Sequence, residues 1–195
     1  MRALVCGAAG FIASHVVDEL IAQGHEVFGI DNLSTGDIDN VNVKSYFQVF
    51  DIKNSLEGKM FEQKFDVIFH LAAKANLQAS ITDPVDSNEE NVRGTLNVLE
   101  FARKTGAAVV FSSSSAVYGD CLNFDEEYPL NPMSPYALQK QIGEQYLELY
   151  SKIYGLRGVA LRYFNVFGER QPESGSYQTV MGIFSNQLKA GKPLT

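Results

Sequence analysis

Short runs rich in Val, Ile and Phe alternate along this chain with longer segments in which apolar residues recur at every third or fourth position. The short runs are typical of buried strands, and the longer segments are typical of helices with one apolar stripe. Strands that alternate with helices predict a doubly wound parallel sheet of the α/β class. We therefore expect six strands, at residues 2–6, 26–30, 46–50, 67–71, 107–112 and 158–162.

Four helical segments separate or follow these strands. The first lies at residues 12–21, where apolar residues recur at four-residue spacing, and Gly24 can end it. The second is expected to start at residue 86 or 87 and to run through residue 103, and the third covers residues 134–154, with a proline in its first turn. A last helical segment is expected at residues 177–190.

Composition and charge narrow the class of protein. The chain has 195 residues, of which 45% are hydrophobic, which suits one large globular domain. Its net charge of -7, without a run of Lys or Arg, gives no footprint for nucleic acid or for a membrane surface, so neither is expected as a partner. No apolar stretch approaches the ~20 residues that span a bilayer. The first strand follows Met1 almost directly, which leaves no room for a targeting segment, so we expect a soluble, cytoplasmic protein.

The cysteines and histidines predict no metal site. Cys6 lies within an apolar run and Cys121 in a loop, and their spacing matches no disulfide or redox motif. The three histidines, His15, His25 and His70, lie on separate elements without the spacing of metal ligands. Each is therefore expected to be a packing or surface residue.

Two glycines follow the first strand and open the first helix. The backbone N–H groups near Gly7 and Gly10, at the positive end of the helix dipole, can hold a pyrophosphate, although the same glycines would also suit a simple tight turn. Asp31 ends the second strand about 20 residues later, where a carboxylate can bind the ribose hydroxyls of adenosine and repel a 2′-phosphate, or can serve only as a turn former. Together these features favour a Rossmann-like site for NAD rather than NADP.

Two further segments follow predicted strands. Asp51 and Ile52 come after the third strand and could reach the adenine ring, although an acid in a loop is more often only solvated. Leu71, Ala72 and Ala73 come after the fourth strand. Their small side chains would let the backbone pass close to the cofactor, or would simply pack.

A tyrosine and a lysine on the third helix are candidates for chemistry. Tyr136 and Lys140 are spaced i, i+4, which places them on one face of the helix, although this spacing is also common on solvated helices. A free tyrosine titrates near pH 10, and lowering its pKa by roughly three units needs about 4 kcal/mol, which a nearby ammonium and a cationic nicotinamide can supply. Four serines at residues 112–115 end the fifth strand, where a hydroxyl could bind a substrate oxygen or close a turn.

An ordered set of short segments runs through the whole chain: Gly7-x-x-Gly10, Asp31-Asn32-Leu33, His70-Leu71-Ala72-Ala73, Ser112-Ser113-Ser114, Val117-Tyr118-Gly119, Ser134-Pro135-Tyr136-x-x-x-Lys140 and Arg162-Tyr163-Phe164-Asn165. Together they resemble the extended short-chain dehydrogenase/reductases, and among these the NAD-dependent sugar-nucleotide epimerases of the UDP-glucose 4-epimerase type. The resemblance implies that Tyr136 is the catalytic acid/base, that Lys140 binds the nicotinamide ribose and lowers the tyrosine pKa, and that Ser114 bonds the sugar oxygen being oxidised.

The same resemblance assigns the other site residues. Phe164 would lie near nicotinamide, and Asn165, with Ser114 and Tyr136, would bind the UDP-hexose substrate. The implied contacts to NAD are Gly7, Gly10, Phe11, Ile12, Asp31, Asn32, Asp51, Ile52, Leu71, Ala72, Ala73, Asn91, Ser112, Tyr136, Lys140 and Phe164. The implied chemistry is redox-neutral: hydride passes from C4 of the sugar to NAD and returns to the other face of a transient 4-keto sugar.

Some positions of this sequence differ from those of related enzymes, and these differences disfavour some of the family's reactions. Ser115 and Ala116 follow Ser114 where the related dehydratases carry an Asp-Glu pair, so dehydration is disfavoured. Reductases of the group usually use NADPH, which Asp31 opposes. UDP-glucuronate decarboxylases share the Tyr-Lys pair, so a relative of that type stays an alternative.

The resemblance also implies how the chain is organised. Residues 1–168 would form the NAD-binding Rossmann domain with the catalytic residues, and residues 169–195 would begin a substrate lobe that is largely absent. A noncatalytic NAD-binding module or a truncated remnant is therefore a second hypothesis. Related enzymes pair two long helices with those of a second copy, so we expect a homodimer, with a separate chain supplying the missing lobe as a further alternative.

Overall fold

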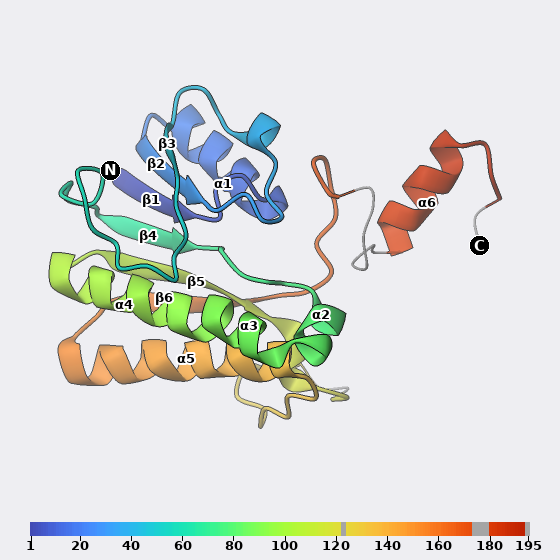
Figure 1. Ribbon diagram of the computed structural model, residues 1–195. Coiled ribbons are helices and arrows are strands. Elements are labelled where there is room, and N and C mark those ends of the chain that lie inside the picture. The colour runs from blue at the N-terminus through green and yellow to red at the C-terminus, as the bar shows by residue number, and fades with distance from the viewer. Residues whose placement is uncertain (122–123, 173–179, 194–195) are drawn as a thin grey trace.

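The computed structural model describes residues 1–121, 124–172 and 180–193. Its centre is a six-stranded parallel sheet with the strand order β3-β2-β1-β4-β5-β6 and helices on both faces (Figure 1). The strands are β1 (Arg2–Cys6), β2 (Glu26–Asp31), β3 (Tyr46–Val49), β4 (Val67–His70), β5 (Ala108–Ser114) and β6 (Gly158–Tyr163). The helices are α1 (Phe11–Ala22), α2 (Leu77–Thr82), α3 (Pro84–Asn88), α4 (Gly94–Thr105), α5 (Pro135–Tyr154) and α6 (Val180–Lys189), with the short turns η1 (Ile38–Asn40), η2 (Glu89–Arg93) and η3 (Ser115–Tyr118).

The predicted α/β fold and all six predicted strands are confirmed, with ends that match or differ by at most two residues. The helix expected to run from residue 86 or 87 through 103 is confirmed as a continuous helical segment that starts at Pro84 and contains a π-helical turn, since α3, η2 and α4 follow one another directly. The short helix α2 was not predicted, because its six residues are too few to show a period. The last helix is confirmed at Val180–Lys189, and residues 177–179 of that prediction lie outside the described part of the chain.

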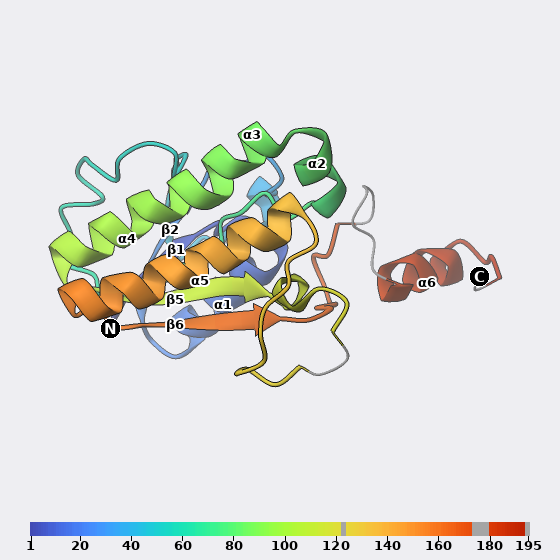
Figure 2. The same cartoon turned by 90° about the horizontal axis from the view of Figure 1, so that it is seen from below.

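One face of the sheet carries the larger core. Helices α4 and α5 lie side by side across it (Figure 2), and their buried residues pack on alternate residues of the strands. Leu4, Ile68 and Phe111 are 0–2% exposed there. Close packing depends on Gly143 of α5, because a Cβ at this position would lie 2.4 Å from the ring of Phe111.

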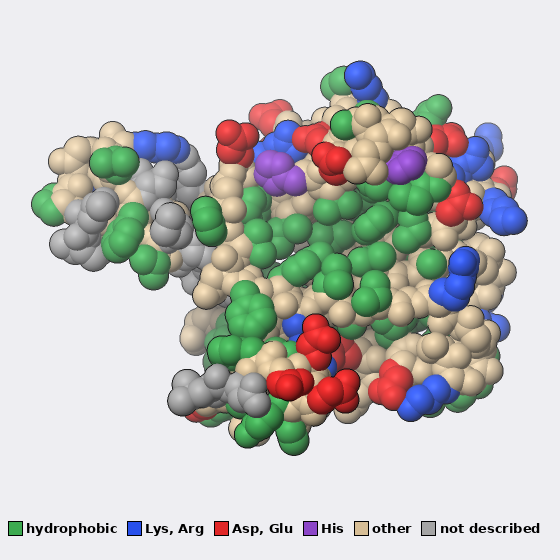
Figure 3. All heavy atoms as spheres, turned by 180° about the vertical axis from the view of Figure 1, so that it is seen from behind, with side chains coloured by type: hydrophobic (Ala, Val, Ile, Leu, Met, Phe, Trp, Pro, Cys, Tyr) green, Lys and Arg blue, Asp and Glu red, His purple; other side chains and the backbone are tan. Residues whose placement is uncertain are grey.

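The other face is covered over only part of its width. Helix α1 packs Ala13, Val17 and Leu20 on β1 and β2. Toward β6 the same face carries Val159 and Leu161, which are 48% and 38% exposed. Figure 3, seen from behind, shows apolar side chains gathered across this face. No helix within the described residues covers β5 and β6 on this side.

Capping residues define the ends of the longest helix. Ser134 caps α5 by accepting a hydrogen bond from Ala137 N at 3.1 Å, Pro135 occupies its first turn, and Gly155 ends it with a left-handed φ of 68°. As predicted, α5 therefore starts next to Tyr136. In the described part of the chain, no helix combines the length and apolarity needed to cross a membrane.

Candidate active site

The carboxyl ends of parallel strands meet at one edge of a sheet, and ligands bind at that edge in open α/β sheets. All strand pairs here are parallel. The edge therefore brings together Gly7 after β1, Asp31 at the end of β2, Leu71 after β4, Ser114 at the end of β5 and Phe164 after β6. These residues come from segments far apart in the sequence, and each was predicted as a site residue.

The glycine turn after β1 leaves no space for a side chain. Gly7 has a φ of 83°, and a Cβ on it would lie 2.8 Å from the backbone nitrogen of Ala72. Gly10 caps α1 with extended backbone, at φ -78° and ψ 165°. The first-turn N–H groups of Phe11 and Ile12 have no acceptor within the helix and point toward this edge of the sheet. The turn fits the close approach of an anionic group such as a pyrophosphate.

Asp31 is held beside this turn. Asp31 is 8% exposed, and its carboxylate accepts hydrogen bonds from Ala9 N at 3.1 Å and from Leu33 N at 2.8 Å. Gly36 passes so close that a Cβ there would lie 2.8 Å from Asp31 Oδ1. An ionised carboxylate has about four acceptor positions, so two remain for the hydroxyls of a ribose. Asp31 thus fits the predicted contact with adenosine.

Asn32 and Asp51 lie together, while Ile52 points elsewhere. Asn32 Nδ2 donates to Asp51 Oδ2 at 3.4 Å. The side chain of Ile52 is 4% exposed and packs on Gly94 at the start of α4, and its carbonyl accepts from Asn97 Nδ2 at 2.8 Å. An adenine contact by Ile52 would therefore involve its backbone, and it stays a prediction.

The segment after β4 is held in place by its neighbours. Leu71 N donates to Cys6 O at 3.0 Å, and the backbone of Ala72 borders Gly7. Beyond Ala73, Lys74 forms two backbone hydrogen bonds with the side chain of Asn91, at 2.7 and 3.1 Å. Asn91 is 3% exposed, and its two hydrogen bonds hold the backbone at Lys74 in place. Its predicted contact with NAD stays a prediction.

Tyr136 and Lys140 lie on the buried face of α5, 7% and 4% exposed. Lys140 Nζ donates to Ser112 O at 2.7 Å and lies 5.9 Å from the ring centroid of Tyr136 and 5.1 Å from that of Phe111. Burial lowers the pKa of Lys140 to about 8. The ammonium is thus still charged at neutral pH, and it faces the aromatic ring of the candidate base.

The structure separates the serines that the sequence left equivalent. Ser112 offers its carbonyl to Lys140, and the hydroxyl of Ser113 donates to the carboxylate of Glu144. Ser114 is the last residue of β5, and its Oγ accepts from Ala116 N at 3.2 Å, which leaves its proton for another partner. This geometry favours Ser114 as the hydroxyl that meets a substrate.

The sequence pattern did not predict one part-buried ion pair. Arg162 of β6 forms a bidentate pair with Glu144 of α5, with Nη2 to Oε2 at 2.8 Å, and its Nη1 donates to Tyr118 Oη at 2.9 Å. This hydrogen-bonding raises the pKa of Arg162 further. The only signal was that Glu144 lies one turn after Lys140, on the same face of the helix.

The segment after β6 returns toward α1. Phe164 is 50% exposed and packs edge-on against Phe124, with centroids 5.1 Å apart, and Asn165 is exposed. Further along, His15 Nε2 lies 2.9 Å from Glu169 O, and Arg170 pairs with Asp18 at 2.6 Å. A hollow of about 360 Å³ between this segment and α1 is lined by Phe11, Ile12, His15, Val166, Phe167, Gly168 and Glu169.

Side chains that could bind a metal ion are dispersed over the described part of the chain. Within residues 1–121, 124–172 and 180–193, no three His, Cys, Asp or Glu side chains gather as they would around a metal ion. His70 is buried, and burial lowers its pKa to about 3, so it stays neutral. Burial and the nearby Asp31 raise the pKa of the Cys6 thiol, so Cys6 is also neutral.

Known proteins resemble this chain in both sequence and fold. The sequence matches the family described as "NAD dependent epimerase/dehydratase family" over residues 3–195. It is 41% identical over 202 residues to the UDP-glucose 4-epimerase of Mycolicibacterium smegmatis, a match that covers 98% of this chain and 64% of that protein. The fold is similar, with a TM-score of 0.91 at 37% identity, to the UDP-glucose 4-epimerase of Thermotoga maritima solved with UDP-glucose, over 98% of this chain and 64% of the other.

Two further matches bear on cofactor and reaction. The structure of the Thermus thermophilus UDP-glucose 4-epimerase in complex with NAD has a TM-score of 0.88 and 39% identity, over 99% of this chain and 64% of that chain. The UDP-glucuronic acid decarboxylase 1 of Xenopus tropicalis is 33% identical over 201 residues, which is 100% of this chain and 47% of that protein. The predicted resemblance is confirmed, and the expected cofactor agrees with the family's description. The chain spans 64% of the length of these three UDP-glucose 4-epimerases.

Proposed function

The chain belongs to the NAD dependent epimerase/dehydratase family, and on that premise we propose that it forms the NAD-binding and catalytic part of a UDP-hexose 4-epimerase. One observation carries the proposal: the buried ammonium of Lys140 lies 5.9 Å from the ring of Tyr136, at the edge of the sheet where Ser114 ends β5. A base, the cation that activates it and a hydroxyl donor are thus collected where a ligand of this fold binds.

The described residues fit NAD. The N-terminus of α1 would hold the pyrophosphate, because the first-turn N–H groups of Phe11 and Ile12 have no acceptor within the helix and the glycines before them, Gly7 and Gly10, carry no side chain. Asp31 would bind the adenosine ribose through its two remaining acceptor positions, and Lys140 would bind the nicotinamide ribose. The chemistry that NAD supplies when bound is reversible hydride transfer.

The residues around the sugar would remove and later return the proton of its C4 hydroxyl. The phenolate of Tyr136 takes the proton of the C4 hydroxyl while the C4 hydrogen leaves as hydride, which gives a 4-keto sugar. Ser114 donates a hydrogen bond to the same oxygen and steadies it as its charge changes. Lys140 stabilises the phenolate by its positive charge. Once the 4-keto sugar had turned within the site and hydride had returned to the other face of C4, Tyr136 would give the proton back, and the product would be the 4-epimer.

The test is the conversion of UDP-galactose to UDP-glucose by the purified chain with NAD, followed by proton NMR. Tyr136→Phe should lower the rate by ~10²–10⁴-fold, the range for a general acid/base, while NADH binding is retained. The matched control is Tyr146→Phe, ten positions later on the same helix and half-buried, which should keep its activity. A fully active Tyr136→Phe variant would contradict the assigned base. NAD binding without conversion by the unaltered chain would favour a noncatalytic module.

The other reactions of the family have less support. Ser115 and Ala116 offer no acid or base for a dehydration. The decarboxylase relative is less identical than the Mycolicibacterium smegmatis epimerase, at 33% against 41%, and is covered over less of its length, so decarboxylation is not favoured. The sugar itself, and whether N-acetyl sugars are accepted, would be read from the same assay with different UDP-hexoses.

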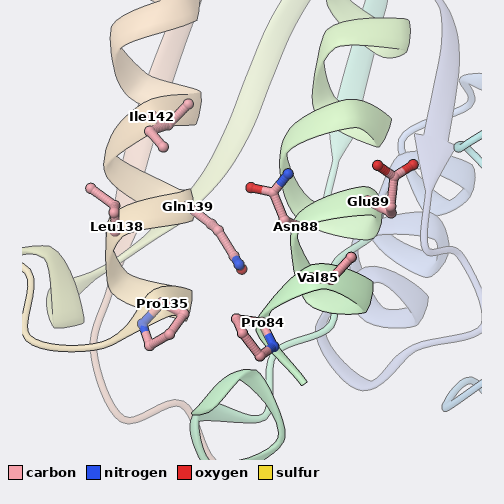
Figure 4. Close-up of a pocket in the computed structure, with 8 residues that line it drawn as sticks. All are labelled: Pro84, Val85, Asn88, Glu89, Pro135, Leu138, Gln139 and Ile142. Carbon is pink, nitrogen blue, oxygen red and sulfur yellow. The ribbon is translucent and has the colours of Figure 1, made fainter. Parts of the chain in front are cut away.

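We further propose that two copies associate through the outer face of α3 and α5. A hollow of about 360 Å³ lies between these helices, lined by Pro84, Val85, Asn88, Glu89, Pro135, Leu138, Gln139 and Ile142 (Figure 4). Along α5 the same outer surface exposes Leu138, Leu149 and Ile153, at 48%, 46% and 60%. Exposed apolar stripes of this kind mark association surfaces. Sedimentation of the purified chain measures whether it is a homodimer.

A further inference from the structure

The N-terminal part of α5 is hydrogen-bonded to buried polar groups from an earlier segment of the chain. Gln139 lies between Tyr136 and Lys140 in the sequence, and its side chain extends from α5 toward α3 (Figure 4). Its Oε1 accepts from Asn91 Nδ2 at 2.8 Å, and its Nε2 donates to Ser87 Oγ at 2.8 Å. Gln139, Asn91 and Ser87 are 4%, 3% and 0% exposed, so water does not compete for these bonds.

A third bond holds the same turn. The backbone N–H of Tyr136 belongs to the group of helix N-terminal donors that lack an acceptor within the helix. It donates instead to Ser80 Oγ of α2, at 3.1 Å, and Ser80 is 0% exposed. The residue that carries the candidate base is thus tied to α2, and its neighbour Gln139 is tied to α3 and η2.

Asn91 connects the hydrogen bonds of Gln139 to the cofactor side of the site. Its amide also binds the backbone N and O of Lys74, which follows directly on the predicted NAD-facing residues Leu71, Ala72 and Ala73. Both Nδ2 hydrogens of Asn91 are used, one by Lys74 O and one by Gln139 Oε1. The two amides therefore form a continuous path from the backbone after β4 to the helix that carries Tyr136 and Lys140.

The path runs through an unusual turn. Asn91 lies in the π-helical turn η2, and such turns are frequent at functional sites. The backbone carbonyl of Asn91 accepts a hydrogen bond from Thr95 Oγ1 at 2.6 Å. Thr95 Oγ1 in turn lies 2.9 Å from Nε2 of His70, at the end of β4. A network of buried amides and hydroxyls has only a few geometries in which all members are satisfied, whereas apolar packing tolerates sliding.

We propose that Gln139 is a positioning residue: through Asn91 and Ser87 it fixes the first turn of α5, and with it Tyr136 and Lys140, relative to the backbone at Lys74. This inference rests on the proposed function, in which that backbone borders NAD and Tyr136 is the base. An apolar residue at position 139 would fill the space but leave the amide of Asn91 and the hydroxyl of Ser87 without their partner. The turn would then sample several positions, and the ammonium of Lys140 would on average lie farther from the phenol of Tyr136.

The experiment follows the ionisation of Tyr136 in the ligand-free chain, by ¹³C NMR of protein labelled at the tyrosine ζ-carbon, with the resonance assigned from Tyr136→Phe. Gln139→Leu should raise the midpoint of that titration by about one pH unit, a tenfold change in the ionisation constant. Ser87→Ala removes one of the two bonds of Gln139 and should give a smaller shift in the same direction. The matched control is Gln145→Leu, because Gln145 is exposed on the same helix and the substitution is chemically the same.

Thermal unfolding and NADH fluorescence of each variant separate the outcomes. Shifts at Gln139 and Ser87, with a double variant that shifts no more than Gln139→Leu alone, would support one shared network. A lower unfolding temperature with an unchanged Tyr136 midpoint in both variants would overturn the inference, because the amides would then contribute stability only. If the unaltered chain fails to bind NADH while the midpoint shifts as expected, the proposed function fails and the positioning role stands.

Discussion

The cofactor half and the catalytic half of the site are held together by different means. Around Gly7 and Asp31, the contacts are made by backbone: N–H groups bind one carboxylate, and chain segments approach so closely that a Cβ would not fit. Around Tyr136 and Lys140, the contacts are made by buried side chains that carry amides, hydroxyls and charges.

This difference between backbone and side-chain contacts indicates which positions in each half tolerate substitution. A backbone turn that depends on a missing Cβ rejects every side chain at one position and is indifferent to most of its neighbours. A buried polar side-chain network is sensitive at each of its members, because removing one partner leaves the other buried and unsatisfied. Three substitutions test this contrast, from the largest expected effect to the smallest.

The largest loss is expected when the ion pair of the catalytic half is broken. Arg162→Met leaves the carboxylate of Glu144, at 13% side-chain exposure, with the hydroxyl of Ser113 but without its cation, and should lower the free energy of unfolding by about 4 kcal/mol. The matched control is Arg103→Met, since Arg103 and Glu100 pair at 35% and 38% exposure, where the expected loss is below about 1 kcal/mol. Urea unfolding of both variants measures the difference, and equal losses would show that burial of the pair is unimportant.

A somewhat smaller loss is expected from one methyl group in the cofactor half. Gly7→Ala places a Cβ at 2.8 Å from Ala72 N on a residue with φ 83°, and should reduce the free energy of unfolding by about 3 kcal/mol and weaken NADH binding. Gly24→Ala has nearly the same φ, 78°, but nothing within 4 Å of its Cβ, so only the backbone strain of about 1 kcal/mol remains. If both variants lose the same amount, close approach is not what selects glycine after β1.

The smallest effect is a gain. Lys140→Met replaces a buried ammonium whose pKa burial lowers from its ordinary 10.5 to about 8, and should raise the free energy of unfolding at pH 7 by about 2 kcal/mol. Between pH 8 and pH 10.5 the unfolded chain binds a proton that the folded chain does not, so the stability of the unaltered protein rises with pH there. The advantage of the Met variant should therefore shrink over that range in urea unfolding. A gain that is constant with pH would mean that the charge of Lys140 is not what destabilises the fold.

The cofactor half was the more predictable of the two. The strands, the turn at Gly7 and Gly10, and Asp31 were all expected from a short stretch of sequence, because each depends on local period, local turn chemistry or a fixed spacing. The start of α5 was expected for the same reason, since Ser134 and Pro135 are local signals of a helix N-terminus.

The support of the catalytic half was not predictable in this way. Gln139 meets Asn91 and Ser87 across 48 and 52 positions of sequence, and Ser113 meets Glu144 across 31. No period or motif marks such partners, because they are selected by the packing of α5 against the sheet and against α3. The π-helical turn η2 within the second helical segment has the same origin, since a local period does not reveal where a turn widens.

The strand order has a consequence for how the chain is made. β1 is synthesised first but lies in the middle of the sheet, where Cys6 pairs with Ile30 on one side and with His70 on the other. The first neighbour leaves the ribosome early, whereas the second follows only after β2 and β3, several seconds later at ~5–20 residues per second. During that interval the strand that ends at the glycine turn has one unpaired edge, which is a template on which a foreign strand could pair until β4 arrives.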